Sequence, residues 1–396
     1  MIPPRIPRNP TLLPQAALAP PALRSRQATG LAVAAAQGRF MLQVCDDCGR
    51  TCYPPREACN SCLGANLHWR DVPPGGVVSA QTTVRISMDP YFRPRTPWRI
   101  GTVRLDCGPD AVVHLHPALA PGDRTRLALK LDKAGQGVIF ALPPSDTPDM
   151  PTDQALRETT CDPRGRRVLV TDGRTPFGQD LARTLIAAGA EVFLGLAAPW
   201  HPFPGQDSLP GTPVTLDLTD SRSTEICAAA IAGRVDIIVN NAGDFRPGHP
   251  GLDDARLAME TTYLAAARLA KYFLPALQAR GGDGPYAACA WVNVLSIAGL
   301  VPDPAYPSAS AAHAAALAQI QALRPSLRPL KLLTAFVGPL DDQWHQALPP
   351  PKVSPAQLAS AVLAGLRSGQ EDIAVGDLAR HTLALWHDNA AITLRR

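Results

Sequence analysis

The stretch VDIIVNNAG, residues 235–243, is an apolar run that ends abruptly in a polar turn. A short continuous apolar run bounded by turn residues is typical of a strand buried on both faces. Similar runs follow and precede it, and they alternate with helical patterns. This alternation predicts an α/β domain on a doubly wound parallel sheet, with a ligand crevice at the carboxyl ends of its strands. The expected strands lie within 166–173, 191–197, 213–219, 235–243, 288–299 and 331–338, and the expected helices within 178–189, 221–233, 252–280, 308–323 and 355–367.

The chain before residue 166 differs in composition, which indicates a multidomain protein. Basic residues outnumber acidic ones by six over residues 1–150, whereas acidic residues are in excess by two over 151–396. Residues 146–165 are polar and lack apolar periodicity, so we interpret them as a linker. Residues 1–28 are rich in proline, alanine and arginine, which favours an extended arm. The arm is either a disordered tail or a segment that lies along a partner.

Cys45, Cys48, Cys59 and Cys62 form the pattern CxxC-x10-CxxC in the segment that follows a short predicted helix. Each pair can form a knuckle that presents two thiolates, and four thiolates satisfy the tetrahedral preference of a closed structural Zn²⁺ site. We therefore predict a helix and zinc ribbon over residues 29–70, with Cys52 as a bystander. All four ligands are sulfur, so we expect the metal to hold the fold and not to catalyse.

Residues 71–145 contain short alternating apolar segments that are separated by glycine, proline and aspartate turns. This pattern predicts a small antiparallel β-barrel. Together with Gly38-Arg39 and Tyr53-Pro54-Pro55-Arg56, the N-terminal segments over about 30–145 resemble the acyl-CoA-associated zinc-ribbon/OB-fold proteins. The resemblance implies a five-stranded OB-fold barrel. It also implies a non-catalytic partner of a thiolase-like enzyme that helps to assemble the complex and contacts coenzyme A.

A basic and aromatic segment within the barrel leaves other ligands open. Its arginines could meet the phosphates of coenzyme A, track a nucleic-acid backbone, or lie in an ordinary solvated loop. The modest net charge of this region disfavours nucleic acid. The segment contains Arg85, Tyr91, Phe92, Arg93, Arg95, Trp98 and Arg99.

Residues of the C-terminal part resemble the short-chain dehydrogenase/reductase family, which implies a Rossmann-type domain over residues 166–396. The resemblance is carried by Asn240-Asn241-Ala242-Gly243, by Asp217, by Ser296 and by Gly338-Pro339-Leu340. In that family Asp217 would bind the adenine amine of NAD(P), and the Asn-Asn-Ala-Gly turn would stiffen the sheet beside the cofactor.

The pyrophosphate turn departs from the family pattern TGxxxGxG. Here it reads TDGRTPFG, residues 171–178, in which Asp172 and Pro176 replace two glycines. A carboxylate repels pyrophosphate, and proline removes a backbone donor. Arg174 could compensate. The second strand ends without an acidic or basic residue, so NAD and NADP cannot be distinguished. The candidate cofactor residues are Gly173, Arg174, Gly178, Asp217, Asn240, Ala242 and Gly243.

The candidate catalytic residues are Ser296, which would polarise a carbonyl, and Tyr306, which would donate a proton. The family lowers the pKa of this tyrosine with a lysine four residues later, but Ser310 stands there. Sliding the register places Pro307 and Ala311 in the tyrosine and lysine roles, and Thr262 stands where the family has asparagine. His313 is the nearest other titratable group.

We therefore expect a catalytically silent dehydrogenase-like domain, a pseudoenzyme. The leading hypothesis is an accessory subunit of an acyl-CoA-processing complex that partners a thiolase-like enzyme. It would pair with itself or with an active relative through helices 252–280 and 308–323. The alternatives are an active NAD(P)-dependent 3-hydroxyacyl-CoA dehydrogenase and a nucleic-acid-binding ribbon/OB protein.

The chain lacks an apolar run of the roughly 20 residues needed to span a bilayer, and its N-terminus lacks the apolar core of a secretory signal. Paired cysteines with metal-ligand spacing favour a reducing compartment. We expect a soluble, cytoplasmic protein.

Overall fold

The computed structural model describes residues 19–22, 24–147, 153–197, 202–203, 205–243, 245, 251–281, 289–343 and 345–393. The chain divides into two compact units. The first comprises Met1–Ala35 and Arg39–Leu156, and the second Ala36–Gly38 and Arg157–Arg396. Most of the predicted arm over 1–28, and residues 148–152 of the predicted linker, lie outside the described residues.

The first unit contains the zinc ribbon, a three-stranded antiparallel sheet in the order β2-β1-β3. The buried side chain of Gln43 in the central strand ties this sheet to the loop after β2. Its Oε1 accepts from the amide of Arg56 at 2.8 Å and its Nε2 donates to the Arg56 carbonyl at 3.1 Å. The elements are the 3-10 turn Arg26–Ala28, α1 (Thr29–Ala36), β1 (Met41–Cys45), β2 (Thr51–Cys52) and β3 (Leu67–Asp71).

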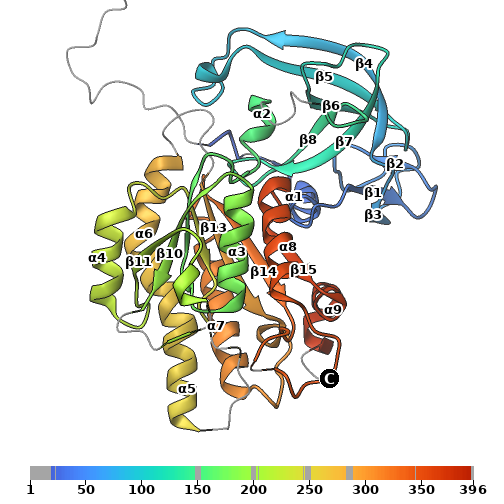
Figure 1. Ribbon diagram of the computed structural model, residues 1–396. Coiled ribbons are helices and arrows are strands. Elements are labelled where there is room, and N and C mark those ends of the chain that lie inside the picture. Colours follow the sequence, from blue (N-terminus) through green and yellow to red (C-terminus); the bar gives the residue numbers. More distant parts are fainter. Residues whose placement is uncertain are drawn as a thin grey trace, which may run out of the picture. The chain divides into compact units, whose positions relative to one another are not determined.

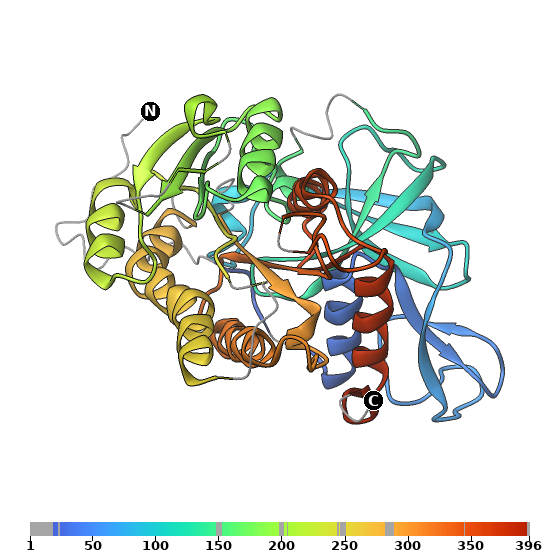
Figure 2. The same ribbon diagram turned by 60° about the horizontal axis from the view of Figure 1, so that its bottom comes forward.

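The rest of this unit is a closed five-stranded barrel in the order β4-β5-β6-β8-β7, which confirms the OB-like prediction and is drawn in cyan and teal in Figure 2. Side chains along β7 alternate between buried and less buried positions, as strands of a filled barrel require. Gly76 has no room for a side chain, because a Cβ there would lie 2.6 Å from the Arg104 carbonyl oxygen. The strands are β4 (Gly75–Val84), β5 (Trp98–Leu105), β6 (Asp110–Leu115), β7 (Arg124–Leu131) and β8 (Gly137–Leu142), with a 3-10 turn at Arg93–Arg95.

The second unit is built on a seven-stranded parallel sheet in the order β11-β10-β9-β12-β13-β14-β15. This confirms the doubly wound α/β prediction. The central strands β12 and β14 are buried along their whole length, because helices cover both faces of the sheet. The strands are β9 (Arg167–Val170), β10 (Glu191–Leu196), β11 (Thr212–Thr215), β12 (Ile237–Asn240), β13 (Ala290–Ser296), β14 (Lys331–Val337) and β15 (Asp372–Val375).

Two apolar cores join the helices to the two faces of this sheet. Helices α4, α6 and α7 pack on one face around Phe273, Trp291 and Ile320, and α3 and α8 pack on the other around Leu181 and Val362. The α3–α8 layer lies in front of the sheet in Figure 1. In the described part of the chain, no helix combines the length and apolar character needed to cross a bilayer. Helix α2 (Gln154–Arg157) belongs to the first unit except for its last residue. The helices of the second unit are α3 (Pro176–Ala187), α4 (Ser221–Ile231), α5 (Leu252–Ala258), α6 (Ala265–Gly281), α7 (Pro307–Leu323), α8 (Pro355–Ser368) and α9 (Asp377–Thr393), with 3-10 turns at Gln206–Ser208 and Ile297–Gly299.

The prediction of a single long helix over 252–280 was wrong. A π-helical segment, Met259–Leu264, separates α5 from α6. The segment contains neither proline nor glycine, so the sequence has none of the usual signals of an interruption. The π turn lies beside the end of the sheet that forms the ligand crevice, and its residue Thr261 lines that crevice.

Candidate functional site

The thiols of Cys45, Cys48, Cys59 and Cys62 converge at the tip of the ribbon, and their sulfur atoms all lie within 4.8 Å of one another. The Cys45–Cys62 and Cys48–Cys59 sulfur pairs are 3.6 Å apart. A tetrahedral Zn²⁺ with Zn–S bonds near 2.3 Å requires sulfur separations of about 3.8 Å. The four residues therefore fit a closed structural zinc site.

Backbone amides favour the thiolate form at Cys59, one cysteine of the second knuckle. The amides of Cys62 and Ser61 donate to the sulfur of Cys59 and lower the pKa of that thiol to about 6, which favours the thiolate that binds zinc. Cys52 lies behind the site, fully buried, with its sulfur 3.8 Å from that of Cys59. It does not belong to the group of four, in line with its predicted role as a bystander.

The second unit holds a crevice of about 1000 Å³ that runs across the carboxyl ends of its strands. Asp172, Arg174, Asp217, Gly243 and Phe245 line it among other residues. The crevice thus brings together the predicted pyrophosphate turn, the predicted adenine ligand and the Asn-Asn-Ala-Gly turn. Its volume is within the range of small-molecule and cofactor sites.

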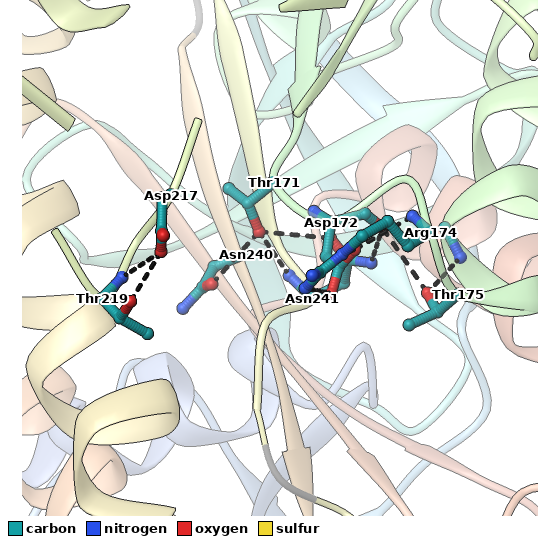
Figure 3. Close-up of polar contacts among 9 residues, drawn as sticks. Thr171, Asp172, Arg174, Thr175, Asp217, Thr219, Asn240 and Asn241 are labelled. Atoms are coloured by element: carbon teal, nitrogen blue, oxygen red, sulfur yellow. Dashed lines mark hydrogen bonds and ion pairs between the residues drawn. The ribbon is translucent and has the colours of Figure 1, made fainter. Parts of the chain in front are cut away.

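The pyrophosphate turn connects β9 to α3 and is held in place by Asn241 (Figure 3). The side chain of Asn241 accepts from the amide of Asp172 at 2.9 Å and donates to the carbonyl of the same residue at 2.7 Å. Gly178 packs on this carbonyl so closely that a Cβ would lie 2.0 Å from its oxygen. Sequence reasoning assigned Asn241 to the turn but missed this clamp on Asp172.

The carboxylate of Asp172 lies in the turn where the pyrophosphate of a cofactor would bind. Asp172 accepts from the backbone amide of Arg174 at 2.9 Å and from its guanidinium through two hydrogen bonds of 3.0 Å (Figure 3). The hydrogen bond to Asp172 is the largest of the effects that raise the pKa of Arg174. Arg174 is therefore engaged by Asp172. A phosphate would have to compete with this carboxylate for the same donors.

The first turn of α3 has few other donors to offer an anion. Pro176 opens the helix and has no N–H. The amide of Gly178 is already bonded to the side chain of Thr175, the N-cap residue, at 3.0 Å. Gly173 packs against Leu194, where a Cβ would lie 2.2 Å from the leucine Cγ.

Asp217 lies at the opposite part of the crevice and is oriented by Thr219. Its Oδ1 accepts from the amide of Thr219 at 2.9 Å and from the hydroxyl at 2.7 Å. These contacts leave the second carboxylate oxygen for an adenine amine, the role that the family resemblance implies. Ala242 lines the crevice two residues after β12, whereas Asn240 is buried at the end of that strand and does not line the crevice.

The two candidate catalytic residues, Ser296 and Tyr306, are not among the residues that line the crevice. Ser296 caps the following 3-10 turn, its Oγ accepting from the amide of Ala298 at 3.1 Å. Tyr306 is the residue before α7, and its hydroxyl is buried without a hydrogen bond to any described residue. Burial first, and then Asp303 and Asp342, raise the pKa of Tyr306. These effects are opposite to what a proton-donating tyrosine requires.

Ser310, which stands where the family has a lysine, has a structural role. The Oγ of Ser310 accepts from the amide of Asp303 at 3.1 Å and fixes the loop before α7. His313 is fully buried, and its Nδ1 accepts from the amide of Ser296 at 3.4 Å. Thr262 is buried in the π-helical segment beside Gly243. Lys271, Lys331 and Lys352 are the only lysines after residue 157, and none lines the crevice.

Sequence reasoning missed Phe245, which lines the crevice, and His345, which contacts Phe245. The ring of Phe245 packs on that of His313 with their centroids 4.7 Å apart. His345 bonds to the carbonyl of Phe245 from the loop after β14. The only sequence signal for this pair is the aspartate at position 342, three residues before the histidine.

The residues present fit an adenine nucleotide in volume and at Asp217, but they do not fit a reacting nicotinamide cofactor. Asp172 contributes negative charge at the pyrophosphate turn, and no lysine is placed to lower the pKa of Tyr306. We therefore derive no hydride-transfer step from this site.

Comparison with protein families assigns three successive parts of the chain. Residues 32–68 match the ChsH2 rubredoxin-like zinc ribbon domain, and residues 69–130 match the ChsH2 C-terminal OB-fold domain. Residues 166–339 match the short chain dehydrogenase family.

Two similar proteins match a short part of the chain. A probable oxidoreductase of Streptomyces antibioticus is 40% identical over 86 residues, and one of Streptomyces lividans is 38% identical over 85 residues. Each match spans 20% of this chain and only 29% of the relative.

Two solved structures have the same fold. A short chain dehydrogenase of Burkholderia cenocepacia J2315 in complex with NADP is 27% identical, with a TM-score of 0.50 over 59% of this chain and 97% of its own. A short-chain dehydrogenase of Streptomyces avermitilis, 24% identical, has a TM-score of 0.50 over 58% of this chain and 94% of its own. Three family matches, four converging thiols and the seven-stranded parallel sheet agree that this chain is a ChsH2-type zinc ribbon and OB-fold fused to a short-chain dehydrogenase domain.

Proposed function

We propose that the protein is a non-catalytic accessory subunit of an acyl-CoA-processing complex. Its zinc-ribbon/OB module partners a thiolase-like enzyme, and its dehydrogenase-like domain serves assembly without transferring hydride. The sequence resemblance to thiolase-partner proteins and the matches to both ChsH2 domains support the role of the module.

One observation carries the non-catalytic part of the proposal. The crevice that would take the cofactor is lined by neither Ser296 nor Tyr306. Catalysis needs a reacting atom within about 3.5 Å of its catalytic groups. The hydroxyl of Ser296 instead caps a turn, and that of Tyr306 is buried.

The barrel offers a surface for a protein partner in the connection after β4. Ile86 and Met88 have 85% and 84% of their surface exposed, which is unusual for large apolar side chains. Arg85 and Arg93 flank them and add positive charge. An apolar pair with a basic surround suits an acidic rim around an apolar pocket on the enzyme.

The assembly role is tested by co-expressing the full chain with a thiolase-like enzyme from the same source. We expect the two to co-elute in size-exclusion chromatography. Replacing both Ile86→Asp and Met88→Asp should weaken the complex at least about tenfold, which corresponds to about 1.4 kcal/mol. Ile226→Asp, an equally drastic change at an exposed site on α4, should not weaken it. Absence of co-elution together with unchanged thiolase activity would reject the proposal.

The second candidate is an active NAD(P)-dependent 3-hydroxyacyl-CoA dehydrogenase. The size of the crevice favours it, as does the similarity to a dehydrogenase solved with NADP. In this candidate Tyr306 donates the proton and Ser296 polarises the carbonyl. It requires turnover of 3-ketoacyl-CoA with NADH or NADPH that Tyr306→Phe abolishes. The accessory proposal predicts no turnover by the purified chain with either cofactor.

A further inference from the structure

His345 is a buried histidine whose two ring nitrogens both face oxygen atoms. Only 3% of its surface is exposed. Its Nδ1 lies 2.7 Å from Oδ1 of Asp342, and its Nε2 lies 2.7 Å from the carbonyl oxygen of Phe245. The backbone amide of His345 also donates to Asp342 at 3.1 Å.

These contacts indicate how many protons the imidazole ring of His345 carries. A carbonyl oxygen only accepts hydrogen bonds, and so does an ionised carboxylate. A neutral imidazole has one N–H, so it can satisfy only one of the two oxygens and would turn a lone pair towards the other. Both contacts are satisfied when His345 is the doubly protonated imidazolium.

The two partners of His345 belong to different walls of the crevice. Phe245 follows β12 and Asp342 follows β14, and β13 separates these strands in the sheet. Both residues line the crevice, while His345 lies behind them. One side chain therefore joins two loops that the sheet itself does not pair. The ring of Phe245, held in this way, lines the crevice and packs against His313.

We propose that His345 is a proton-dependent clamp on the inner wall of the crevice. In its doubly protonated form it holds Phe245 to the loop of Asp342, and loss of one proton releases the two walls from each other. The clamp therefore controls how far a ligand can enter from the adenine side towards Ser296 and Tyr306. This inference does not depend on whether the domain is catalytic.

The groups around His345 determine whether its pKa is raised or lowered, and therefore at which pH the clamp holds. Burial acts to lower the pKa of His345, but the hydrogen bond and charge of Asp342 and the Phe245 carbonyl outweigh it and raise the pKa above the ordinary 6.5. Lys352 opposes them weakly. Tyr306, whose ring centroid lies 6.3 Å away, has a raised pKa, so it stays a neutral phenol. Because the folded pKa is raised, the clamp is intact at low pH and is lost as pH rises through that value.

The protonation state is measured first, by NMR of the full chain with ¹⁵N-labelled histidine. His345→Gln identifies the signal. We expect the shifts of an imidazolium at pH 6.5 and a titration midpoint above the ordinary value of about 6.5 for histidine. A neutral imidazole at pH 6.5 would overturn the proposal.

The movement is measured by hydrogen–deuterium exchange at several pH values, corrected for the intrinsic pH dependence of exchange. Peptides that contain 237–245 and 337–343 should exchange about tenfold faster above the His345 midpoint, the ratio expected for one lost charged hydrogen bond of about 1.4 kcal/mol. His345→Gln should exchange fast at every pH. The control His381→Gln, at an exposed site on α9, should retain the wild-type response.

A second variant covers the case in which His345→Gln does not fold. Asp342→Asn keeps the size of the side chain but removes the charge that raises the pKa of His345. We expect it to move the exchange transition to lower pH. Exchange in the wild type that does not change with pH after correction, or an unmoved transition in Asp342→Asn, would overturn the clamp.

Discussion

Asp172 places a carboxylate in the crevice where the pyrophosphate of a cofactor would bind, at a position that is glycine in the family pattern. Opposite or like charges about 4 Å apart near a protein surface interact with about 4 kcal/mol at an effective dielectric of 20. The ion pair with Arg174 uses the guanidinium that a phosphate would need. Neutralising this one carboxylate should therefore both remove repulsion and release a cation.

We predict that Asp172→Asn binds NADPH at least about tenfold more tightly than the wild-type chain, a gain of about 1.4 kcal/mol or more. Calorimetric titration of the two proteins measures it. Glu191→Gln is the matched control, since it neutralises an exposed carboxylate at the opposite end of the strands and should leave the affinity unchanged. Equal affinity of Asp172→Asn and the wild type would mean that the pyrophosphate does not approach this turn.

A second prediction at the scale of the residue concerns Cys45. It is fully buried at the zinc site and ends β1, so Cys45→Ser removes one of the four sulfur ligands. We expect bound zinc to fall from about one ion per chain to nearly none, because affinity depends on all four thiolates. Metal analysis by mass spectrometry of the purified variant measures the loss.

Cys52→Ser is the comparison for that variant. Its sulfur also lies within 4 Å of Cys59, but it is outside the group of four. The ribbon should retain its zinc in Cys52→Ser. Loss of the metal from this variant would mean that five cysteines share the site.

At the scale of one element, the start of α4 allows a clean test of helix capping. The side chain of Asp220 accepts from the amides of Arg222 at 2.9 Å and Ser223 at 3.2 Å. Asp220→Ala should destabilise the second unit by about 1 kcal/mol, the usual cost of losing an N-cap. Chemical denaturation with the fluorescence of Trp291 as probe measures the change. Glu225→Ala, exposed in the middle of the same helix, should be within about 0.5 kcal/mol of the wild type.

The sequence predicted the elements of the sheet better than the shape of its helices. Apolar runs such as Ile237–Asn240 identify buried strands because strands covered on both faces need continuous apolar sequence. The π-helical segment Met259–Leu264 was missed, since it depends on packing beside the crevice and not on local helix breakers. The start of α7 was predicted more closely, because the expected helix over 308–323 left Tyr306 outside and α7 begins at Pro307.

The candidate site was predictable where its chemistry is local in sequence. The spacing CxxC-x10-CxxC by itself predicts that four cysteines can surround a metal. Comparison with the glycine pattern identifies Asp172 directly. The Phe245–His345 contact joins residues 100 positions apart, and only the folded sheet brings them together. Its hydrogen bonds therefore leave no periodic or motif signal in the chain.

At the scale of the whole molecule, zinc stabilises only one of the two compact units. The metal ligands all lie in the first unit, whereas the second has its own apolar cores around the parallel sheet. We predict that removing zinc with a strong chelator unfolds the ribbon and leaves the second unit folded. Scanning calorimetry should show one transition lowered or lost and another unchanged. Far-UV circular dichroism should retain the helical signal, because the helices of more than eight residues all lie in the second unit among the described residues. Unfolding of both units in a single transition on chelation would contradict this division, and Asp220→Ala would then lower that shared transition instead of only one of two.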